Sequence, residues 1–324
     1  MARRRDVRLV EASQDERLTA RIVRRVPLIY NAGPPDRPPH VRAASGVRRL
    51  GGQLAVVQDD ANWIALVEAG AGGDDAIRAV PLPPGPGGER LLEKKLKLDL
   101  EACVVAPGEV LVAFGSGSTA ARERVALLLP DLTSALRDAA PLYRALRETV
   151  DFAGSELNVE GAVLLGDTLR LFQRGNGAPS EGLQPVDASC DLSWPAVWEL
   201  IQGGAWSGSP RNVVRYELGL LSDVRLTFTD ATRAPGGVVF VAAAEDSPDT
   251  FRDGEVVGAA VGTIDGEWRA RWTPLTDSGG RLLPVKVEGI TLDPAAPSRA
   301  VAVLDADDPE RPAELLELEL DGPW

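Results

Sequence analysis

The sequence predicts an all-β protein, a β-propeller of five blades with about four strands in each blade. A short phrase recurs five times: an acidic residue, a small residue and a third residue that opens an apolar run. The copies are Ser45-Gly46-Val47, where serine replaces the acid, Glu101-Ala102-Cys103, Glu160-Gly161-Ala162, Asp230-Ala231-Thr232 and Glu288-Gly289-Ile290. Repeats several tens of residues long that are built from short strands are typical of propellers.

Within each copy, apolar segments of strand length follow one another and are separated by turn residues such as Gly51-Gly52 and Pro107-Gly108. Glycine in such pairs allows the backbone conformations that tight hairpins need. The expected strands are 45–50, 53–58, 63–68 and 76–82 in the first copy, 102–106, 109–114 and 124–129 in the second, 162–165, 168–173, 197–201 and 213–218 in the third, and 230–233, 237–243, 256–263 and 267–273 in the fourth. One helix is expected over 132–148, where leucines recur near helical spacing.

The ends of the chain complete the expected architecture. The fifth copy supplies only three strands, 289–292, 299–304 and 314–320, whereas a spare strand, 18–28, precedes the first copy. We expect 18–28 to complete the last blade, because pairing the two ends removes open sheet edges. The whole chain, 1–324, is then a single domain. A six-bladed count is the alternative, if the first 40 residues and the segment with the expected helix form a further blade.

The charge of the chain limits the classes of partner. The net charge is −13 and the isoelectric point is near 4.7. Nucleic acids and anionic membranes attract basic surfaces, so neither is an expected partner. We expect no transmembrane segment and no secretory signal, because neither a long apolar run nor a basic start followed by apolar residues is present. Two cysteines are too few for a disulfide scaffold. A bacterial, cytoplasmic protein is expected, of undetermined oligomeric state.

Propeller geometry brings acidic residues together. The first strand of a blade lines the central channel, so the starts of these strands lie around one mouth of that channel. This predicts a ring of Glu101, Glu160, Asp230 and Glu288 at the mouth. Several carboxylates that converge on an axis repel one another, and Ca²⁺, which prefers oxygen ligands, relieves that repulsion. Alternatively, the acids accept hydrogen bonds from backbone N–H groups or hold channel water.

A substrate-binding region is expected at the same mouth. Small hydroxyl residues suit the oxygens of an anion, and an arginine adds a planar pair of donors. The candidate residues are Ser116, Ser118, Arg174 and Asn176, with Lys95 or Lys97 beside them. The alternative is an ordinary hairpin tip that uses serine and glycine for turn chemistry.

Three segments carry a family resemblance. Leu157-Asn158-Val159-Glu160-Gly161, Val287-Glu288-Gly289-Ile290-Thr291 and Val303-Leu304-Asp305-Ala306-Asp307-Asp308-Pro309 resemble bacterial propellers of the esterase-like, phytase-related family. The resemblance implies a site at the channel mouth, dependence on calcium in some members, and phosphoesters as the substrate class. Glu160, Glu288 and Asp305 match that pattern, whereas Ser45 departs from it.

Two functions remain open from the sequence. The first is a metal-assisted hydrolase of a phosphorylated or otherwise anionic small molecule. In that case, the four carboxylates hold Ca²⁺, while Arg174, Ser116 and Ser118 position the anion. The second is a non-enzymatic propeller that binds a small molecule or a protein through the same face, since propeller folds serve both kinds of function.

Overall fold

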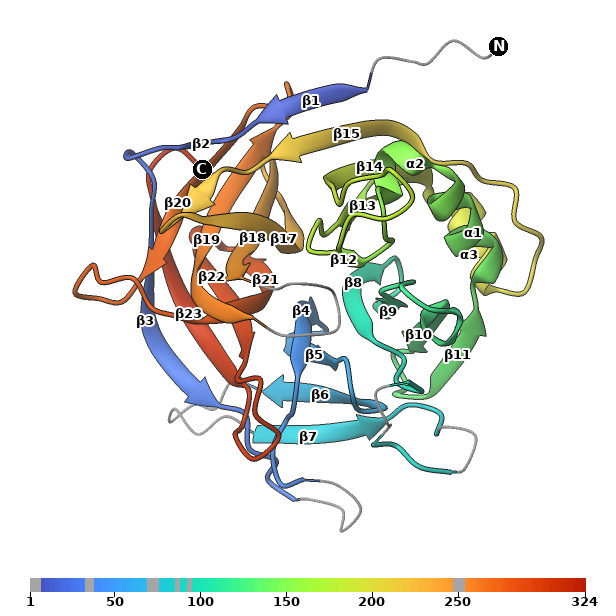
Figure 1. Cartoon of the computed structure of the whole chain (residues 1–324). Coiled ribbons are helices and arrows are strands. Elements are labelled where there is room, and N and C mark those ends of the chain that lie inside the picture. The colour runs from blue at the N-terminus through green and yellow to red at the C-terminus, as the bar shows by residue number, and fades with distance from the viewer. Residues whose placement is uncertain (1–6, 33–37, 69–75, 85–87, 92–94, 247–253) are drawn as a thin grey trace, which may run out of the picture.

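The computed structural model describes residues 7–32, 38–68, 76–84, 88–91, 95–246 and 254–324. The described chain consists mainly of β-strands, and its sheets are arranged around a central axis in the manner of a propeller (Figure 1). Among the described segments, no helix has the length and apolar character that crossing a membrane requires. The all-β, propeller-like architecture predicted from the sequence is confirmed.

The first two sheets are regular antiparallel meanders of four strands. One contains β4 (Ala44–Leu50), β5 (Gln53–Gln58), β6 (Trp63–Glu68) and β7 (Ala76–Pro81) in that order. The other contains β8 (Leu100–Ala106), β9 (Val110–Gly115), β10 (Arg124–Leu128) and β11 (Ser134–Asp138). A 3₁₀ turn, Ala120–Arg122, precedes β10. Each sheet follows the order of the chain, as the hairpin turns in the sequence predict.

The third sheet has an additional strand from the N-terminal segment. Its main strands are β12 (Val159–Leu165), β13 (Thr168–Gln173), β14 (Asp187–Ser193) and β15 (Arg211–Glu217). Strand β1 (Arg8–Glu11) pairs in parallel with β15 at the outer edge. The N-terminal segment therefore covers an edge that would otherwise expose unpaired backbone groups.

The remaining strands form one ten-stranded sheet. Its members are β16 (Leu220–Leu221), β17 (Val224–Ala234), β18 (Gly237–Asp246), β19 (Glu255–Asp265), β20 (Ala270–Thr276), β3 (Thr19–Pro27), β23 (Glu314–Asp321), β22 (Ala296–Asp305) and β21 (Lys286–Asp293), and β2 (Ser13–Gln14) pairs with β20. Strand β3 is antiparallel to β23, which is the pairing of the two chain ends expected from the sequence. On its other edge, β3 pairs in parallel with β20.

Two expectations about local structure are wrong. The expected helix over 132–148 is shorter: its first part is β11, paired with β10, and only α1 (Ala140–Glu148) is helical, followed by α2 (Val150–Ala153). The expected strand 197–201 belongs to helix α3 (Trp194–Ile201), where Pro195 occupies the first turn. The apolar side chains of α3 recur at helical spacing and pack into the core, so the helical period overrides strand propensity.

In the part of the chain that the structure describes, five inner strands lie around the axis. Strands β4, β8, β12, β17 and β21 lie side by side in a ring, in which β21 also contacts β4 (Figure 1). The inner strands approach closely: a Cβ added at Gly289 would lie 2.8 Å from the Gly46 Cα atom. The small residue of the repeated phrase is therefore required by contact between neighbouring inner strands. Buried apolar side chains fill the spaces between sheets, for example the edge-to-face pairs of Phe228 with Phe172, Tyr216 and Phe240.

Each inner strand has a β-bulge at the same place. The register shifts occur between Ala44 and Gly46, Leu100 and Ala102, Val159 and Gly161, Phe228 and Asp230, and Val287 and Gly289. The bulged residues are Ser45, Glu101, Glu160, Thr229 and Glu288. In the fourth copy, the equivalent of the acid is thus Thr229 and not Asp230. Successive side chains of a strand point to opposite faces. Because of this offset of one residue, the Asp230 side chain points to the face opposite to that of the acids in the other copies.

Candidate functional site

Asp230 is part of a central ion pair and not of the mouth. Its Oδ2 and Oδ1 atoms accept hydrogen bonds from Arg48 Nη1 and Nη2 at 2.8 and 2.9 Å. The Ile290 N–H also donates to Asp230 Oδ2 at 2.9 Å. The side chains of Arg48 and Asp230 are only 8% and 1% exposed. The expectation that Asp230 joins the other acids as a metal ligand is wrong, because its oxygens are already satisfied.

Arg48 connects the inner strands at this level. Its guanidinium donates to four backbone carbonyl groups, those of Val47, Ala162, Ala231 and Ile290. These carbonyls belong to β4, β12, β17 and β21. A buried ion pair is tolerated when the donors of its cation find further acceptors, as Arg48 Nη1 and Nη2 do here. We call Arg48 and Asp230 the axial pair.

Polar side chains gather around the bulges and the neighbouring strand ends, and we call this set the mouth cluster. It consists of Asp59, Lys97, Asp99, Glu101, Ser116, Ser118 and Arg122 on one side, and of Asn158, Glu160, Arg174, Asn176, Glu245, Lys286, Glu288 and Asp305 on the other. The strand order explains the gathering, because Glu101, Glu160 and Glu288 lie at bulges of inner strands, whereas Glu245 and Asp305 lie at or beside the ends of second strands.

On the first side, Asp99 is the centre of the network. Lys97 Nζ lies 2.7 Å from Asp99 Oδ1 and 2.5 Å from Asp59 Oδ2. Arg122 Nη1 lies 2.8 Å from Asp99 Oδ2, and Ser116 Oγ donates to the same oxygen at 2.5 Å. Charge-assisted bonds of this kind fix the Asp99 carboxylate in one orientation.

The two serines of the expected anion site belong to this network. Ser118 Oγ accepts a hydrogen bond from Arg122 Nη1 at 2.6 Å and lies 3.0 Å from Ser116 Oγ. Ser116 is buried, and its hydroxyl hydrogen is directed to Asp99. The structure thus brings Ser116 and Ser118 together, but it uses them to hold an acid. Lys95 is exposed, whereas Lys97, the sequence-based alternative, lies inside the cluster.

Glu101 differs from its neighbours. Oxygen atoms of Asp59, Asp99 and Glu101 all lie within 4.8 Å of one another. No described residue forms a hydrogen bond or ion pair with the Glu101 carboxylate. Burial raises the pKa of Glu101 well above its usual value, and the negative charges of Glu160, Asp99 and Asp59 raise it further. Three carboxylates at this distance, one of them without a donor, form a set of oxygen ligands suited to a hard cation.

On the second side, Arg174 joins several acids. Its Nη2 donates to Glu245 Oε2 at 2.7 Å and its Nε donates to Thr227 Oγ1 at 3.1 Å. Its Nη1 lies 3.5 Å from Glu160 Oε1, which also accepts a hydrogen bond from Asn158 Nδ2 at 2.7 Å. Asn176 is present as well, since its Oδ1 accepts a bond from Asn158 Nδ2 at 3.3 Å.

Lys286 and Glu288 complete this side. Lys286 Nζ lies 2.7 Å from Glu288 Oε1 and 3.7 Å from Glu245 Oε2. The other oxygen of Glu288, Oε2, is buried and has no hydrogen-bond partner. Sequence reasoning did not identify Lys286. A signal was present, because a polar residue stands two positions before the acid in three copies: Asp99 before Glu101, Asn158 before Glu160 and Lys286 before Glu288.

Electrostatic interactions link the two sides. Burial raises the pKa of Glu160 to about 7; Arg174 lowers it, whereas the charge of Glu288 raises it. Burial and the charges of Asp307 and Asp59 raise the pKa of Asp305 to about 8. The pKa of Asp59 rises to about 6 for the same reason, burial, despite the opposing charge of Lys97. Asp59, Glu160 and Asp305 therefore titrate near neutral pH.

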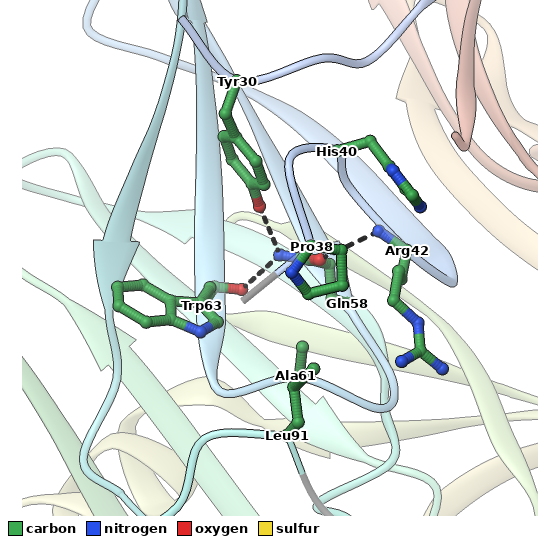
Figure 2. Close-up of a pocket in the computed structure, with 8 residues that line it drawn as sticks. All are labelled: Tyr30, Pro38, His40, Arg42, Gln58, Ala61, Trp63 and Leu91. Atoms are coloured by element: carbon green, nitrogen blue, oxygen red, sulfur yellow. Dashed lines mark hydrogen bonds between the residues drawn. The ribbon is translucent and has the colours of Figure 1, made fainter. Parts of the chain in front are cut away.

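A separate small pocket lies beside the cluster and contains the single histidine (Figure 2). It is lined by Tyr30, Pro38, His40, Arg42, Gln58, Ala61, Trp63 and Leu91. The Gln58 amide lies at its centre, where it donates to Tyr30 Oη and the Trp63 carbonyl and accepts from the Arg42 N–H (Figure 2). Arg42 is paired with Asp60 at 2.6 Å. Because protein partners use these groups, the pocket is a weaker candidate than the mouth cluster.

Comparisons with known proteins identify a family without an assigned activity. The family model described as "Family of unknown function (DUF6929)" matches residues 40–320. No curated protein matches the chain.

Solved structures resemble the chain only distantly. A catalytically inactive virginiamycin B lyase from Staphylococcus aureus, with quinupristin, is 9% identical, with a TM-score of 0.41 and coverage of 85% of this chain and 80% of the other. A luciferin-regenerating enzyme is 12% identical, with a TM-score of 0.39 and coverage of 87% and 80%. A glycosyl hydrolase from Bacteroides ovatus is 8% identical, with a TM-score of 0.37 and coverage of 86% and 84%. Because the sequence identities and TM-scores are this low, none of these activities is assigned to this chain.

Proposed function

We propose that this chain, which belongs to the family of unknown function DUF6929, is a cation-dependent hydrolase whose site is the mouth cluster. The observation that carries the proposal is the Glu101 carboxylate, which lacks a hydrogen-bond donor and lies beside the carboxylates of Asp59 and Asp99. Ca²⁺ is the first candidate, because it accepts several oxygen ligands in irregular geometry. The resemblance to the phytase-related propellers points to the same ion.

The proposed ligands differ in part from those expected from the sequence. Glu101 remains, and Asp59 and Asp99 join it in place of Asp230. Glu160 and Glu288 are not among the described carboxylates whose oxygens lie within 4.8 Å of one another, so they surround the proposed cation as charged neighbours.

The chemistry would depend on both parts of the cluster. A bound divalent cation supplies Lewis-acid polarisation of an ester or phosphoester oxygen. Glu160, with a pKa raised to about 7, can accept a proton near neutral pH and return it to a leaving group. An anionic substrate would be held through the cation, since Arg122 and Arg174 are already paired with carboxylates.

We also propose a count of five blades. The sheets of β4–β7, β8–β11 and β12–β15 are three blades, and the ten-stranded sheet consists of two blades joined where β20 meets β3. The closed ring of the five inner strands supports this count.

The test uses the full chain in Ca²⁺ and in chelator. We expect millimolar Ca²⁺ to raise the melting temperature of the wild type, because a ligand of the folded state stabilises it. The Glu101→Gln variant should lose this response, whereas Glu148→Gln, at an exposed residue of α1, should keep it.

The second part of the test is a screen of esters and phosphoesters with and without chelator. Hydrolysis that requires Ca²⁺ and is lost in Glu101→Gln and Glu160→Gln supports the enzyme. A Ca²⁺-dependent rise in melting temperature without any turnover would favour the non-enzymatic binding propeller. An unchanged melting temperature would contradict the cation site.

A further inference from the structure

We infer that the second side of the mouth cluster binds a primary ammonium group of a small molecule, with Glu288 as its principal acceptor. This inference rests on the proposed function, because it names a chemical feature of the substrate that would occupy the mouth. It assigns a second subsite next to the proposed cation, formed by Glu288, Glu160 and Asp305.

The first observation is an unused acceptor. The Glu288 side chain is 8% exposed, and its Oε2 atom is buried without a hydrogen-bond partner. A buried carboxylate oxygen that lacks a donor costs free energy unless a ligand, a proton or water satisfies it. The other oxygen of the same carboxylate, Oε1, lies 2.7 Å from Lys286 Nζ, which is also 3.7 Å from Glu245 Oε2, so the Glu288 carboxylate belongs to the cluster.

The second observation is the balance of charge. The carboxylates around the mouth are Asp59, Asp99, Glu101, Glu160, Glu245, Glu288 and Asp305, whereas the cations among the described residues of the cluster are Lys97, Arg122, Arg174 and Lys286. On the first side, Lys97 and Arg122 together with a divalent cation would fully compensate Asp59, Asp99 and Glu101. The acids of the second side still outnumber Arg174 and Lys286, so this side attracts a further positive charge.

The third observation concerns the cations, which argue against an anion at this subsite. Each one lies close to at least one carboxylate: Lys97 to Asp59 and Asp99, Arg122 to Asp99, Arg174 to Glu245 and Glu160, and Lys286 to Glu288 and Glu245. Binding an anion here would break these pairs and leave buried carboxylates without compensation. A primary ammonium instead brings three donors to a region that has unused acceptors.

The choice between an ammonium and a neutral hydroxyl follows from the acids themselves. Burial raises the pKa of Glu160 to about 7 and that of Asp305 to about 8, and neighbouring carboxylates raise both further. An ammonium would supply a positive charge and release protons from these groups, whereas a hydroxyl would not. Binding should therefore strengthen as the pH rises from about 5.5 to 8.

The test uses 1,4-diaminobutane as the probe and 1,4-butanediol as the neutral control of equal length. We expect titration calorimetry of the full chain, in saturating Ca²⁺ at pH 7.5, to detect binding of the diamine only. Proton release should appear as a dependence of the observed heat on the ionisation enthalpy of the buffer. Inorganic phosphate should not bind at this subsite.

Matched variants separate this inference from the proposed function. Glu288→Gln should weaken diamine binding at least tenfold and keep the stabilisation by Ca²⁺. Glu101→Gln should lose the Ca²⁺ response and keep diamine binding in chelator, and Glu148→Gln should keep both. Equal binding of diamine and diol, or diamine binding that Glu288→Gln leaves unchanged, would overturn the ammonium subsite. Loss of the Ca²⁺ response in Glu101→Gln would still stand as support for the cation site.

Discussion

At the centre of the ring, both oxygens of Asp230 have donors from Arg48 and from a backbone N–H group, whereas at the mouth Glu101 has no hydrogen-bond partner among the described residues. Both acids project from inner strands of the same ring. The difference is in the donors that surround them. The carboxylate oxygens of the axial pair have donors from the protein itself. Some carboxylate oxygens of the mouth cluster have a partner only if a proton, water or a ligand supplies one.

This difference separates structural acids from candidate functional acids. A buried charge with all its partners holds neighbouring elements in register, as Arg48 does for four inner strands. Incompletely paired acids with raised pKa values are typical of sites that act on a ligand, where stability is sacrificed for function. Burial alone does not distinguish the two, because Asp230 and Glu288 are both buried.

The largest expected effect is at the axial pair. Asp230→Asn removes the charge that compensates Arg48 and leaves a buried guanidinium without a counter-ion. We expect the free energy of unfolding to fall by about 3–5 kcal/mol, measured by urea denaturation. The double variant Arg48→Met with Asp230→Asn removes both charges and should lose less than the two single variants together. Additive losses would show that the two residues do not act as a pair.

The second prediction concerns the pH dependence of the mouth. The pKa values of Asp59, Glu160 and Asp305 are raised in the folded protein to about 6, 7 and 8. In this range, the folded state binds more protons than the unfolded state, so stability falls as the pH rises. We expect Glu160 alone, whose pKa lies in the middle of this range, to contribute a loss on the order of 2.5 kcal/mol between pH 5 and pH 8 in chelator. Saturating Ca²⁺ should reduce the slope, and a stability that rises with pH over this window would contradict the raised pKa values.

The sequence was sufficient to predict the general architecture and three acids of the mouth cluster, but it did not predict the axial pair. The repeated phrase predicted the inner strands, and the spare N-terminal strand predicted the pairing of β3 with β23. Glu101, Glu160 and Glu288 occupy equivalent bulges. These features depend on local patterns, namely a small residue where inner strands approach and glycine in hairpin turns.

The errors have physical causes that a single sequence conceals. In the fourth copy, the phrase can be aligned on Asp230 or one residue earlier, and only the bulge shows that Thr229 is the equivalent residue. The apolar residues of helix α3 suit a strand as well as a helix, and packing against the core decides in favour of the helical period. The partners of Ser116 and Ser118 depend on Asp99 and Arg122, which tertiary structure brings together.

A third prediction sharpens the contrast between the two regions. Glu101→Gln removes a charge that has no partner and that its neighbours repel, so it should stabilise the protein where Asp230→Asn destabilises it. We expect a gain on the order of 1 kcal/mol at pH 8 in chelator, the size found when functional strain is relieved. Thermal or urea denaturation measures it, with Glu148→Gln as the control near zero. A destabilised Glu101→Gln would indicate a structural role for Glu101.

The smallest expected effect tests the assignment of Thr229 to the bulge position. Thr229 Oγ1 donates to the carbonyl of Val287 in the neighbouring inner strand at 2.5 Å, and the hydroxyl of Ser45 donates in the same way to the carbonyl of Leu100. At these two bulges a hydroxyl thus links adjacent inner strands where the other three have an acid. Thr229→Val keeps the shape of the side chain and removes the hydrogen bond, so we expect a loss of about 1 kcal/mol with an unchanged response to Ca²⁺. If Thr229→Val instead altered the Ca²⁺ response as Glu101→Gln does, the mouth cluster would extend to the fourth inner strand, and the separation of the axial pair from the mouth would be wrong.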